Sequence, residues 1–234
     1  MIRTVAETGS TNADLLADAA VFPEGTWLRA ERQTGGRGRL GREWASPVGN
    51  LYASTLVRVM PGDPDAPSLA LVAGVAVQAA AAAWAGAGAS TLTLKWPNDL
   101  LADGAKLAGI LLERSGGAIV AGIGVNLAVA PEGLARATTS LAALTGAAPD
   151  PAYFLGDLAR EFALWLGRWR GQGIGVVRAA WLERAHPIGT VLSVRGPDGA
   201  REGLFDGLDA DGALRLRLAD GSVEIVRAGD VFLV

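Results

Sequence analysis

The stretch "GGRGRLGREWASPVGN", residues 35–50, sets three arginines among five glycines and contains Trp44 and the pair Ser46-Pro47. Glycine leaves the backbone bare, so its N–H groups can approach a ligand, and arginine forks match carboxylate and phosphate oxygens in pairs. The stretch is neither a Walker P-loop, which needs GxxxxGK[ST], nor a GxGxxG turn that follows a strand in a βαβ unit. By itself it leaves three interpretations open: a solvated turn, an RNA-binding segment, or a clamp for a small anion.

The composition is that of a compact globular protein whose charge is local. Half of the 234 residues are hydrophobic and 19% are charged, a balance that argues against a disordered chain. The 21 basic residues face 24 acidic ones, which argues against a nucleic-acid-binding surface over the whole protein. The chain has no cysteine, which excludes disulfides, thiolate zinc sites and a cysteine nucleophile. The single histidine, His186, excludes a histidine-rich metal site, and we predict a structural role for it and no metal held by protein ligands.

No segment of the sequence predicts export or a membrane span. The N-terminal residues, "MIRTVAETGSTN", lack the apolar run of a signal peptide. The longest apolar run, residues 69–84, is interrupted by Gln78 and is shorter than the ~20 residues that a span requires. We therefore predict a buried core helix there, no membrane partner and, given the absence of cysteine, a cytoplasmic protein.

Helical and strand patterns alternate up to about residue 185. In "STNADLLADAA", Ser10 or Thr11 can cap a short helix that carries Asp14 in its first turn. The other predicted elements are strands at residues 51–59 and 91–96, a hairpin over 106–129 that turns at Gly116-Gly117, and helices over 67–86, 152–170 and 174–185.

The sequence pattern changes after Pro187. Short alternating runs such as "GALRLRL" (212–218) are separated by turn signals at residues 196–199, 209–212 and 219–222. Four or five short strands in this length indicate a small barrel. No long linker precedes them, so we expect two domains, residues 1–186 and 187–234, that pack together.

Polar residues interrupt three apolar strand patterns. "KWPNDLL" (95–101) carries Asp99 at the end of a predicted strand, "GAKLAGILLE" (104–113) carries Lys106, and "AGIGVNLAV" (121–129) carries Asn126. Any one of these residues alone is more often structural. Three of them beside an arginine loop indicate one convergent pocket.

These motifs together resemble the biotin–protein ligase family. The matching elements occur in family order: "GSTNADL" (9–15), "ERQTGGRGRLGREWASPVGNLYAST" (31–55), "KWPNDLL", "KLAGILLE" and "GIGVNL" (122–127). The resemblance implies an α+β fold in which a mixed sheet with helices, related to class II aminoacyl-tRNA synthetases, is followed by an SH3-like β-barrel. Residues 1–186 would form the catalytic ligase domain and 187–234 the barrel.

The resemblance also implies a reaction in two steps. The carboxylate of biotin attacks the α-phosphate of Mg-ATP and gives biotinyl-5′-AMP and pyrophosphate; a lysine of a biotin carboxyl carrier protein then displaces AMP. The protein needs no nucleophilic side chain for this chemistry, and its cations offset the repulsion between two anions. The alternative is a lipoate or octanoate protein ligase on the related fold, against which the arginine loop and KWPND argue.

Site residues follow from the matching positions. Lys106 would neutralise the biotin carboxylate, Arg37 would lie near the acyl-phosphate, and Asp99 would orient or deprotonate the incoming lysine or be structural. Gly109 would let the backbone approach the biotin rings, and Asn126 would contact the phosphate or the base. The expected catalytic residues are Lys106, Arg37 and Asp99; the biotin-binding residues are Ser10, Thr11, Asn12, Gln33, Gly36, Arg37, Lys106 and Gly109; the nucleotide-binding residues are Arg39, Arg42, Trp44, Lys106 and Asn126.

The sequence departs from the family pattern at the N-terminus, in the compact Ser-Pro turn "SPVGN" (46–50), which is a variation in length only, and in residues 130–144. Some members carry an N-terminal winged helix-turn-helix, whereas the motifs here begin at residue 9, so we expect no DNA partner and a monomer or weak homodimer. The stretch "APEGLARATTSLAAL" (130–144) stands where the family has a second mobile loop that covers the adenine.

Overall fold

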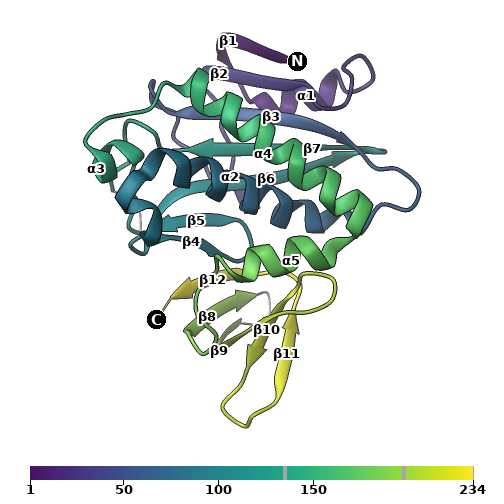
Figure 1. The fold of residues 1–234 in the computed structure, drawn as a ribbon, viewed down its shortest axis with the longest axis vertical. Helices are drawn as coiled ribbons and strands as arrows, with labels where there is room; N and C mark the ends of the chain where they lie inside the picture. The colour runs from purple at the N-terminus through teal and green to yellow at the C-terminus, as the bar shows by residue number, and fades with distance from the viewer. Residues whose placement is uncertain (134–135, 197–198, 234) are drawn as a thin grey trace.

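The computed structural model describes residues 1–133, 136–196 and 199–233. A large sheet of seven strands carries helices on both faces, and a sheet of five strands follows it (Figure 1). The large sheet has the order β1-β2-β3-β7-β6-β5-β4, in which β1 and β2 are parallel and the other pairs antiparallel. Its strands are β1 (Ile2–Thr8), β2 (Trp27–Gln33), β3 (Leu51–Arg58), β4 (Leu92–Lys95), β5 (Asp99–Ala102), β6 (Ala105–Ser115) and β7 (Ala118–Val125).

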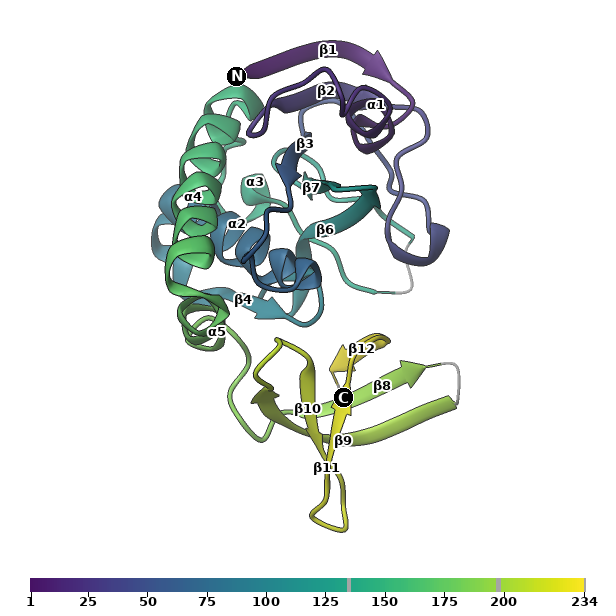
Figure 2. The same cartoon turned by 90° about the vertical axis from the view of Figure 1, so that its right-hand side faces the viewer.

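Two long helices cover one face of this sheet. They are α2 (Leu69–Ala85) and α4 (Pro151–Gln172), and the shorter α3 (Leu141–Thr145) and α5 (Ile174–Leu182) lie beside them (Figure 2). The buried residues of α4 recur at helical spacing, and its Phe162 meets Trp27 of β2 edge to face, with 5.6 Å between ring centres. The predicted helices at 67–86, 152–170 and 174–185 are confirmed within a few residues.

Helix α2 is the core of the larger body. Residues Ala66–Thr91, which contain it, are apolar enough by length and composition to cross a membrane, because an 18-residue stretch among them has a mean hydropathy of 1.7. Yet 61% of that stretch is buried inside the fold, where α2 contacts both the sheet and α4. The stretch is therefore the core helix that the sequence predicts.

The opposite face of the sheet is only partly covered. Helix α1 (Thr11–Ala17) lies on this face (Figure 2). Its Leu15 belongs to a buried cluster with Leu28, Leu56 and Val120 of the strands. Ser10 caps the helix, because its side chain accepts from the N–H of Ala13 at 3.5 Å. Helix α1 packs against β2, β3, β7 and part of β6. A pocket remains on this face, with Asp99 of β5 and Lys106 of β6 in its lining.

The predicted hairpin is confirmed, and some strands are new. β6 and β7 pair from Ser115↔Ala118 onward, and Gly116 turns the chain with a φ of +57° that glycine adopts without strain. Strands β1, β2 and β5 were not predicted from the sequence. β5 is buried at all four positions and β1 is largely exposed, so neither shows the alternation of a half-buried strand.

The second sheet is antiparallel, with the order β11-β10-β9-β8-β12. Its strands are β8 (Val191–Gly196), β9 (Gly199–Leu208), β10 (Leu214–Arg217), β11 (Val223–Val226) and β12 (Asp230–Leu233). The turns predicted at 209–212 and 219–222 are observed, with Gly212 and Gly221 at positive φ; of the turn at 196–199, residues 197–198 lie outside the described residues. The side chain of Trp96 donates to the carbonyl of Gly212 at 3.2 Å and so joins the two sheets.

Candidate functional site

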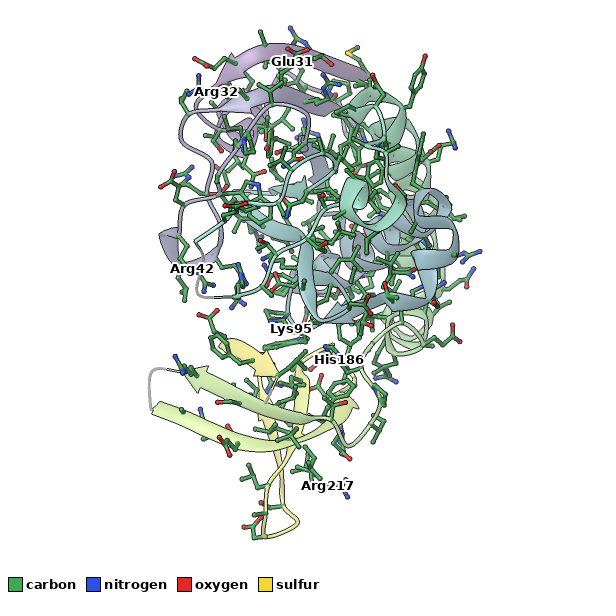
Figure 3. All side chains as sticks on the ribbon, turned by 90° about the vertical axis from the view of Figure 1, so that its left-hand side faces the viewer. Glu31, Arg32, Arg42, Lys95, His186 and Arg217 are labelled. Atoms are coloured by element: carbon green, nitrogen blue, oxygen red, sulfur yellow. The ribbon has the colours of Figure 1, made fainter. Side chains whose placement is uncertain are left out.

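A pocket opens on the uncovered face of the large sheet, toward the second sheet. Its floor is a row of paired residues across four strands, Asp99↔Gly109↔Gly124↔Tyr52. Figure 3 shows Arg42 and Lys95 at the boundary between the two sheets, on the side of this pocket. The pocket brings together most of the residues predicted from the sequence, namely Ser10, Thr11, Asn12, Gln33, Arg37, Arg39, Arg42, Trp44, Asp99, Lys106 and Gly109.

Two predicted residues lie beside this pocket rather than in its lining. Asn126, just after β7, borders an adjoining recess together with Trp44, Lys106 and Arg136. Its amide donates to the carbonyl of Thr139 at 3.1 Å, so the structure already uses it to hold the chain that follows β7. Gly36 lies against the carbonyl of Trp44, where a side chain would come within 2.7 Å of that oxygen.

The centre of the site is a cluster of charges around the buried side chain of Asp99. Lys106 donates to Oδ1 of this carboxylate, and both side chains are more than nine-tenths buried. Oδ2 lies 3.4 Å from Nζ of Lys95 and 3.2 Å from Nη1 of Arg136. One carboxylate thus faces three cations, and the excess positive charge suits an anionic ligand.

Burial and charge shift the pKa values of this pair. Burial lowers the pKa of Lys106 to about 8, against the attraction of Asp99 and with a further push from the charge of Arg136. Burial would raise the pKa of Asp99, but the charges of Lys106 and Lys95, the hydrogen bond from Lys106 and the charge of Arg136 outweigh it, so the pKa is lowered. Asp99 is therefore a carboxylate at neutral pH, while Lys106 is poised to lose its proton under mildly alkaline conditions.

Trp44 lies over the two glycines of the floor, Gly109 and Gly124, which we call the glycine floor. Its ring centre is 5.2 Å from Nζ of Lys106, within range of a cation–π contact. A Cβ atom at Gly109 would stand 2.8 Å from this ring, and one at Gly124 would stand 2.6 Å from it. Only bare backbone therefore fits beneath the indole.

Hydrogen bonds tie α1 to the strands at the other end of the pocket. Oε1 of Gln33 accepts from the backbone N–H of Thr11 at 2.9 Å and from its hydroxyl at 3.1 Å, which turns the Gln33 amide nitrogen toward Gly36. The Thr11 hydroxyl also lies 2.7 Å from Oγ of Ser54, which donates to Oδ1 of Asn12 at 2.6 Å. Ser54 is fully buried, and its only sequence signal is a hydroxyl inside an apolar strand.

The three loop arginines reach separate partners. Arg39 donates to the carbonyl of Gly229 at 3.1 Å, and Arg42 forks onto the carboxylate of Asp230 at 2.8 and 3.1 Å. Nη2 of Arg37 lies 3.7 Å from Oε1 of Glu113 in β6. The start of β12 thus holds the loop that the sequence singled out, a contact that sequence reasoning missed.

Residue Arg136 was also missed. It comes from the stretch 130–144 that was predicted to form a second loop over the site, of which residues 134–135 lie outside the described residues. Its guanidinium reaches the central carboxylate of Asp99 and borders both the pocket and the adjoining recess. Basic character in that stretch is the one sequence signal that could have found it.

Comparison with known proteins explains why these residues lie together. The sequence profile of the Biotin/lipoate A/B protein ligase family matches residues 10–129, which contain the loop, Asp99, Lys106 and Asn126. The chain belongs to this family. The profile of the Biotin protein ligase C terminal domain matches residues 193–234, the second sheet.

Individual members of the family are similar over nearly the whole chain. A biotin–[acetyl-CoA-carboxylase] ligase of Paracoccus denitrificans is 40% identical over 97% of this chain and 98% of its own length. The bifunctional ligase/repressor BirA of Escherichia coli is 32% identical over 96% of this chain and 71% of its own length. The biotin protein ligase of Aquifex aeolicus, solved in complex with biotin and ATP, superposes with a TM-score of 0.86 at 27% identity and covers 100% of this chain and 99% of its own. The resemblance found in the sequence is therefore confirmed at the level of family and fold.

Proposed function

We propose that this protein activates biotin with ATP to biotinyl-5′-AMP and transfers the biotin to a lysine of a biotin carboxyl carrier protein. The similar proteins support this, since one is named a biotin–[acetyl-CoA-carboxylase] ligase and another was solved with biotin and ATP. The observation that carries the proposal is the cluster in which Lys106, Lys95 and the more exposed Arg136 surround the buried Asp99 beside an arginine loop. Such an excess of cations is what two anionic substrates require.

The first step joins two anions. An oxygen of the biotin carboxylate attacks the α-phosphorus of ATP, a bond forms between them, and pyrophosphate leaves with the electron pair of the broken P–O bond. Lys106 offsets the charge on the carboxylate and on the phosphorus oxygens, and Arg37, Arg39 and Arg42 hold phosphate oxygens once Asp230 releases the loop. Fixed cations also hold the reactants in line, which lowers the barrier.

The second step is acyl transfer. The ε-amine of the acceptor lysine attacks the acyl carbon of biotinyl-5′-AMP, the C–O bond to phosphate breaks, and AMP leaves. The amine must be neutral to attack, and the carboxylate of Asp99 is the acceptor that we assign to orient it or to take its proton. Lys106 keeps the leaving phosphate neutralised.

The remaining assignments divide the pocket. The biotin part is formed by Ser10, Thr11, Asn12, Gln33, Gly36 and Gly109. The nucleotide part is formed by Arg39, Arg42, Trp44 and Asn126. Mg²⁺ enters on the phosphates of ATP, as part of the substrate; among the described residues no group of three or more His, Asp or Glu side chains could hold a metal ion. We place the boundary between the two domains at residues 186 and 187 and the protein in the cytoplasm.

Two assays test the proposal. Exchange of labelled pyrophosphate into ATP that depends on biotin, and not on lipoate or octanoate, reports the first step and separates this activity from the other branch of the family. Biotin on the lysine of a purified carrier domain, absent when that lysine is replaced by arginine, reports the second. Exchange driven by lipoate instead of biotin would overturn the proposal.

A further inference from the structure

Glu113 of β6 lies between two parts of the site that are far apart in sequence. One carboxylate oxygen, Oε2, accepts from Nδ2 of Asn12 at 2.7 Å. The other, Oε1, stands 3.7 Å from Nη2 of Arg37 in the loop. The side chain is 28% exposed, and it lies outside the set of residues that line the pocket. Glu113 therefore faces the site through other residues.

The Asn12 amide has a single orientation because protein groups use both its ends. Its side chain lies directly above Gly122, and the residue is 4% exposed. Nδ2 donates to Glu113 and, at 3.3 Å, to the carbonyl of Leu111, while Oδ1 accepts from Ser54. An amide whose donors are fixed at one end must present its oxygen at the other.

This orientation reaches the biotin part of the pocket. The Ser54 hydroxyl donates its one proton to Asn12, so its oxygen accepts from the hydroxyl of Thr11, 2.7 Å away, which shares its proton between Ser54 and Oε1 of Gln33 at 3.1 Å. Thr11 in turn holds Oε1 of Gln33 through its backbone N–H. Glu113 is thus the outer end of a chain of hydrogen bonds that ends on Gln33.

We propose that Glu113 is a positioning residue for biotin, with different tasks for its two oxygens. Oε2 fixes the orientation of Asn12. Through the hydrogen bonds that run from Asn12 to Gln33, it also fixes the side chains assigned to the biotin part of the pocket. Oε1 holds Arg37 beside the floor until the anionic substrate draws it away. The proposal rests on the proposed function, because it assigns this end of the pocket to biotin.

The two tasks differ in what they require of residue 113. Asn12 is neutral, so a neutral acceptor at the position of Oε2 still satisfies its N–H, by a weaker bond than the one to a carboxylate. Arg37 is half exposed and 3.7 Å away, so its ion pair with Glu113 contributes little energy. The carboxylate of Glu113 also competes with the anionic substrate for the guanidinium of Arg37. The acceptor at residue 113 should therefore matter for biotin binding, and the negative charge should not.

Three variants separate acceptor from charge. Glu113→Gln keeps the acceptor and removes the charge, Glu113→Asp keeps the charge but draws the oxygens back by one methylene, and Glu113→Ala removes both. We expect biotin to bind about tenfold more weakly to Glu113→Asp and Glu113→Ala, as for a lost, partly buried hydrogen bond to a charged group. Glu113→Gln should bind as tightly as the wild type or up to about threefold tighter.

The measurement is titration calorimetry with biotin, together with biotin-dependent pyrophosphate exchange. In Glu113→Asp the KM for biotin should rise about tenfold while kcat at saturating biotin stays within about twofold of the wild type, a split that general destabilisation does not produce. Glu31→Ala is the matched control, because Glu31 is also a strand glutamate paired with an arginine, Arg29 at 3.4 Å, but stands far from the second sheet (Figure 3). Its Kd should be unchanged.

Each outcome decides between the possibilities. Wild-type affinity in Glu113→Asp overturns the assignment, and so does a Glu113→Gln protein that is as weak as Glu113→Asp, since charge would then be what matters. If Glu113→Ala fails to fold, the comparison of the other two variants still decides. A wild-type protein that does not bind biotin at all would instead overturn the proposed function.

Discussion

Lys106 of β6 and Asp99, the first residue of β5, form an ion pair in which the two side chains are 7% and 5% exposed. A buried pair of this kind is costly to desolvate, and replacing it with apolar groups is often neutral or stabilising. Here Asp99 also meets Lys95 and Arg136, so the cluster keeps a net positive charge that nothing in the described residues neutralises. This excess positive charge indicates that the cluster binds an anionic ligand rather than stabilises the fold.

Removing the lysine tests that interpretation. Lys106→Ala should lower the rate of biotin-dependent pyrophosphate exchange by about a hundredfold or more, as for the loss of a group that meets charge in the transition state. Arg114→Ala is the control, because Arg114 is a cation on the same strand whose guanidinium donates to the nearby carbonyl of Gly116 outside the pocket lining. Near-normal exchange in Lys106→Ala, with a normal thermal midpoint, would contradict the role assigned to it.

The pH dependence of the first step should report the same residue. Burial lowers the pKa of Lys106 to about 8, so the ligand-free enzyme loses this cation as pH rises through that value. We expect kcat/KM for biotin to fall above pH 8 and the fall to move to higher pH in Lys106→Arg, because arginine stays charged. A flat profile from pH 7 to about 9.5 in the wild type would contradict this.

The same loss of a proton from Lys106 changes the stability of the fold in the opposite direction from the activity. The unfolded chain binds the proton of Lys106 up to its ordinary pKa of 10.5, whereas the folded chain releases it near 8. Between these values the unfolded state holds more protons, so this group's contribution to the free energy of unfolding rises with pH. Activity and this contribution to stability should therefore change in opposite directions, which thermal melts at pH 7.5 and 9 will show.

The contact between the loop and β12 predicts a measurable change in mobility. Arg42 binds Asp230 and Arg39 binds Gly229, and the loop arginines are sites for trypsin. Asp230→Ala should speed cleavage within residues 35–46 severalfold in the ligand-free protein, and biotin with Mg-ATP should slow cleavage of the wild type. Asp220→Ala, in an exposed turn of the same sheet, is the control. Equal cleavage with and without ligands would contradict the clamp.

The sequence predicted the residues whose chemistry is unusual for their surroundings. Lys106 and Asp99 were found because charged side chains interrupt apolar runs, and the loop was found because arginine and glycine alternate in it. Asn126 was found in the same way, as a polar residue in an apolar run, whereas Gly109 came from the family resemblance. Helix α2 was found because nearly every residue is apolar over five turns.

The residues that were missed lie far away in sequence and have ordinary neighbours. Asp230 is 188 positions from Arg42, and no local pattern shows that a loop and a terminal strand will meet. Glu113 looks like the polar end of an apolar strand until Asn12, 101 positions away, folds against it. Strand β5 was missed because all four of its residues are buried, so its sequence shows no alternation of polar and apolar residues.

The glycine floor predicts a steric effect on biotin binding. A Cβ at Gly124 would stand 2.6 Å from the Trp44 ring, so Gly124→Ala must push the indole away from the pocket floor. We expect the KM for biotin to rise about tenfold, by analogy with the cost of overpacking a close contact. Gly117→Ala on the same hairpin has open space around its Cβ and should leave KM unchanged. Since the clash is with Trp44, adding Trp44→Ala to Gly124→Ala should cost less than Trp44→Ala does in the wild type.

Helix α4 offers a gain in stability at a position remote from the site. Gly167 lies inside this 22-residue helix, somewhat more than one turn before its end at Gln172; it is exposed and has nothing within 4 Å of where a Cβ would stand. Alanine restricts the unfolded chain and favours the helix, so Gly167→Ala should raise the free energy of unfolding by about 0.5–1 kcal/mol. For a protein of this length that is a rise in Tm of about 2–4 °C at the upper end.

Gly173→Ala is the contrasting variant. Gly173 ends α4 with a φ of +78°, which alanine adopts only with strain, so this change should lower the free energy of unfolding. Urea unfolding of both variants checks the pair, and a Gly167→Ala protein less stable than the wild type would mean that α4 packs differently from the structure described here.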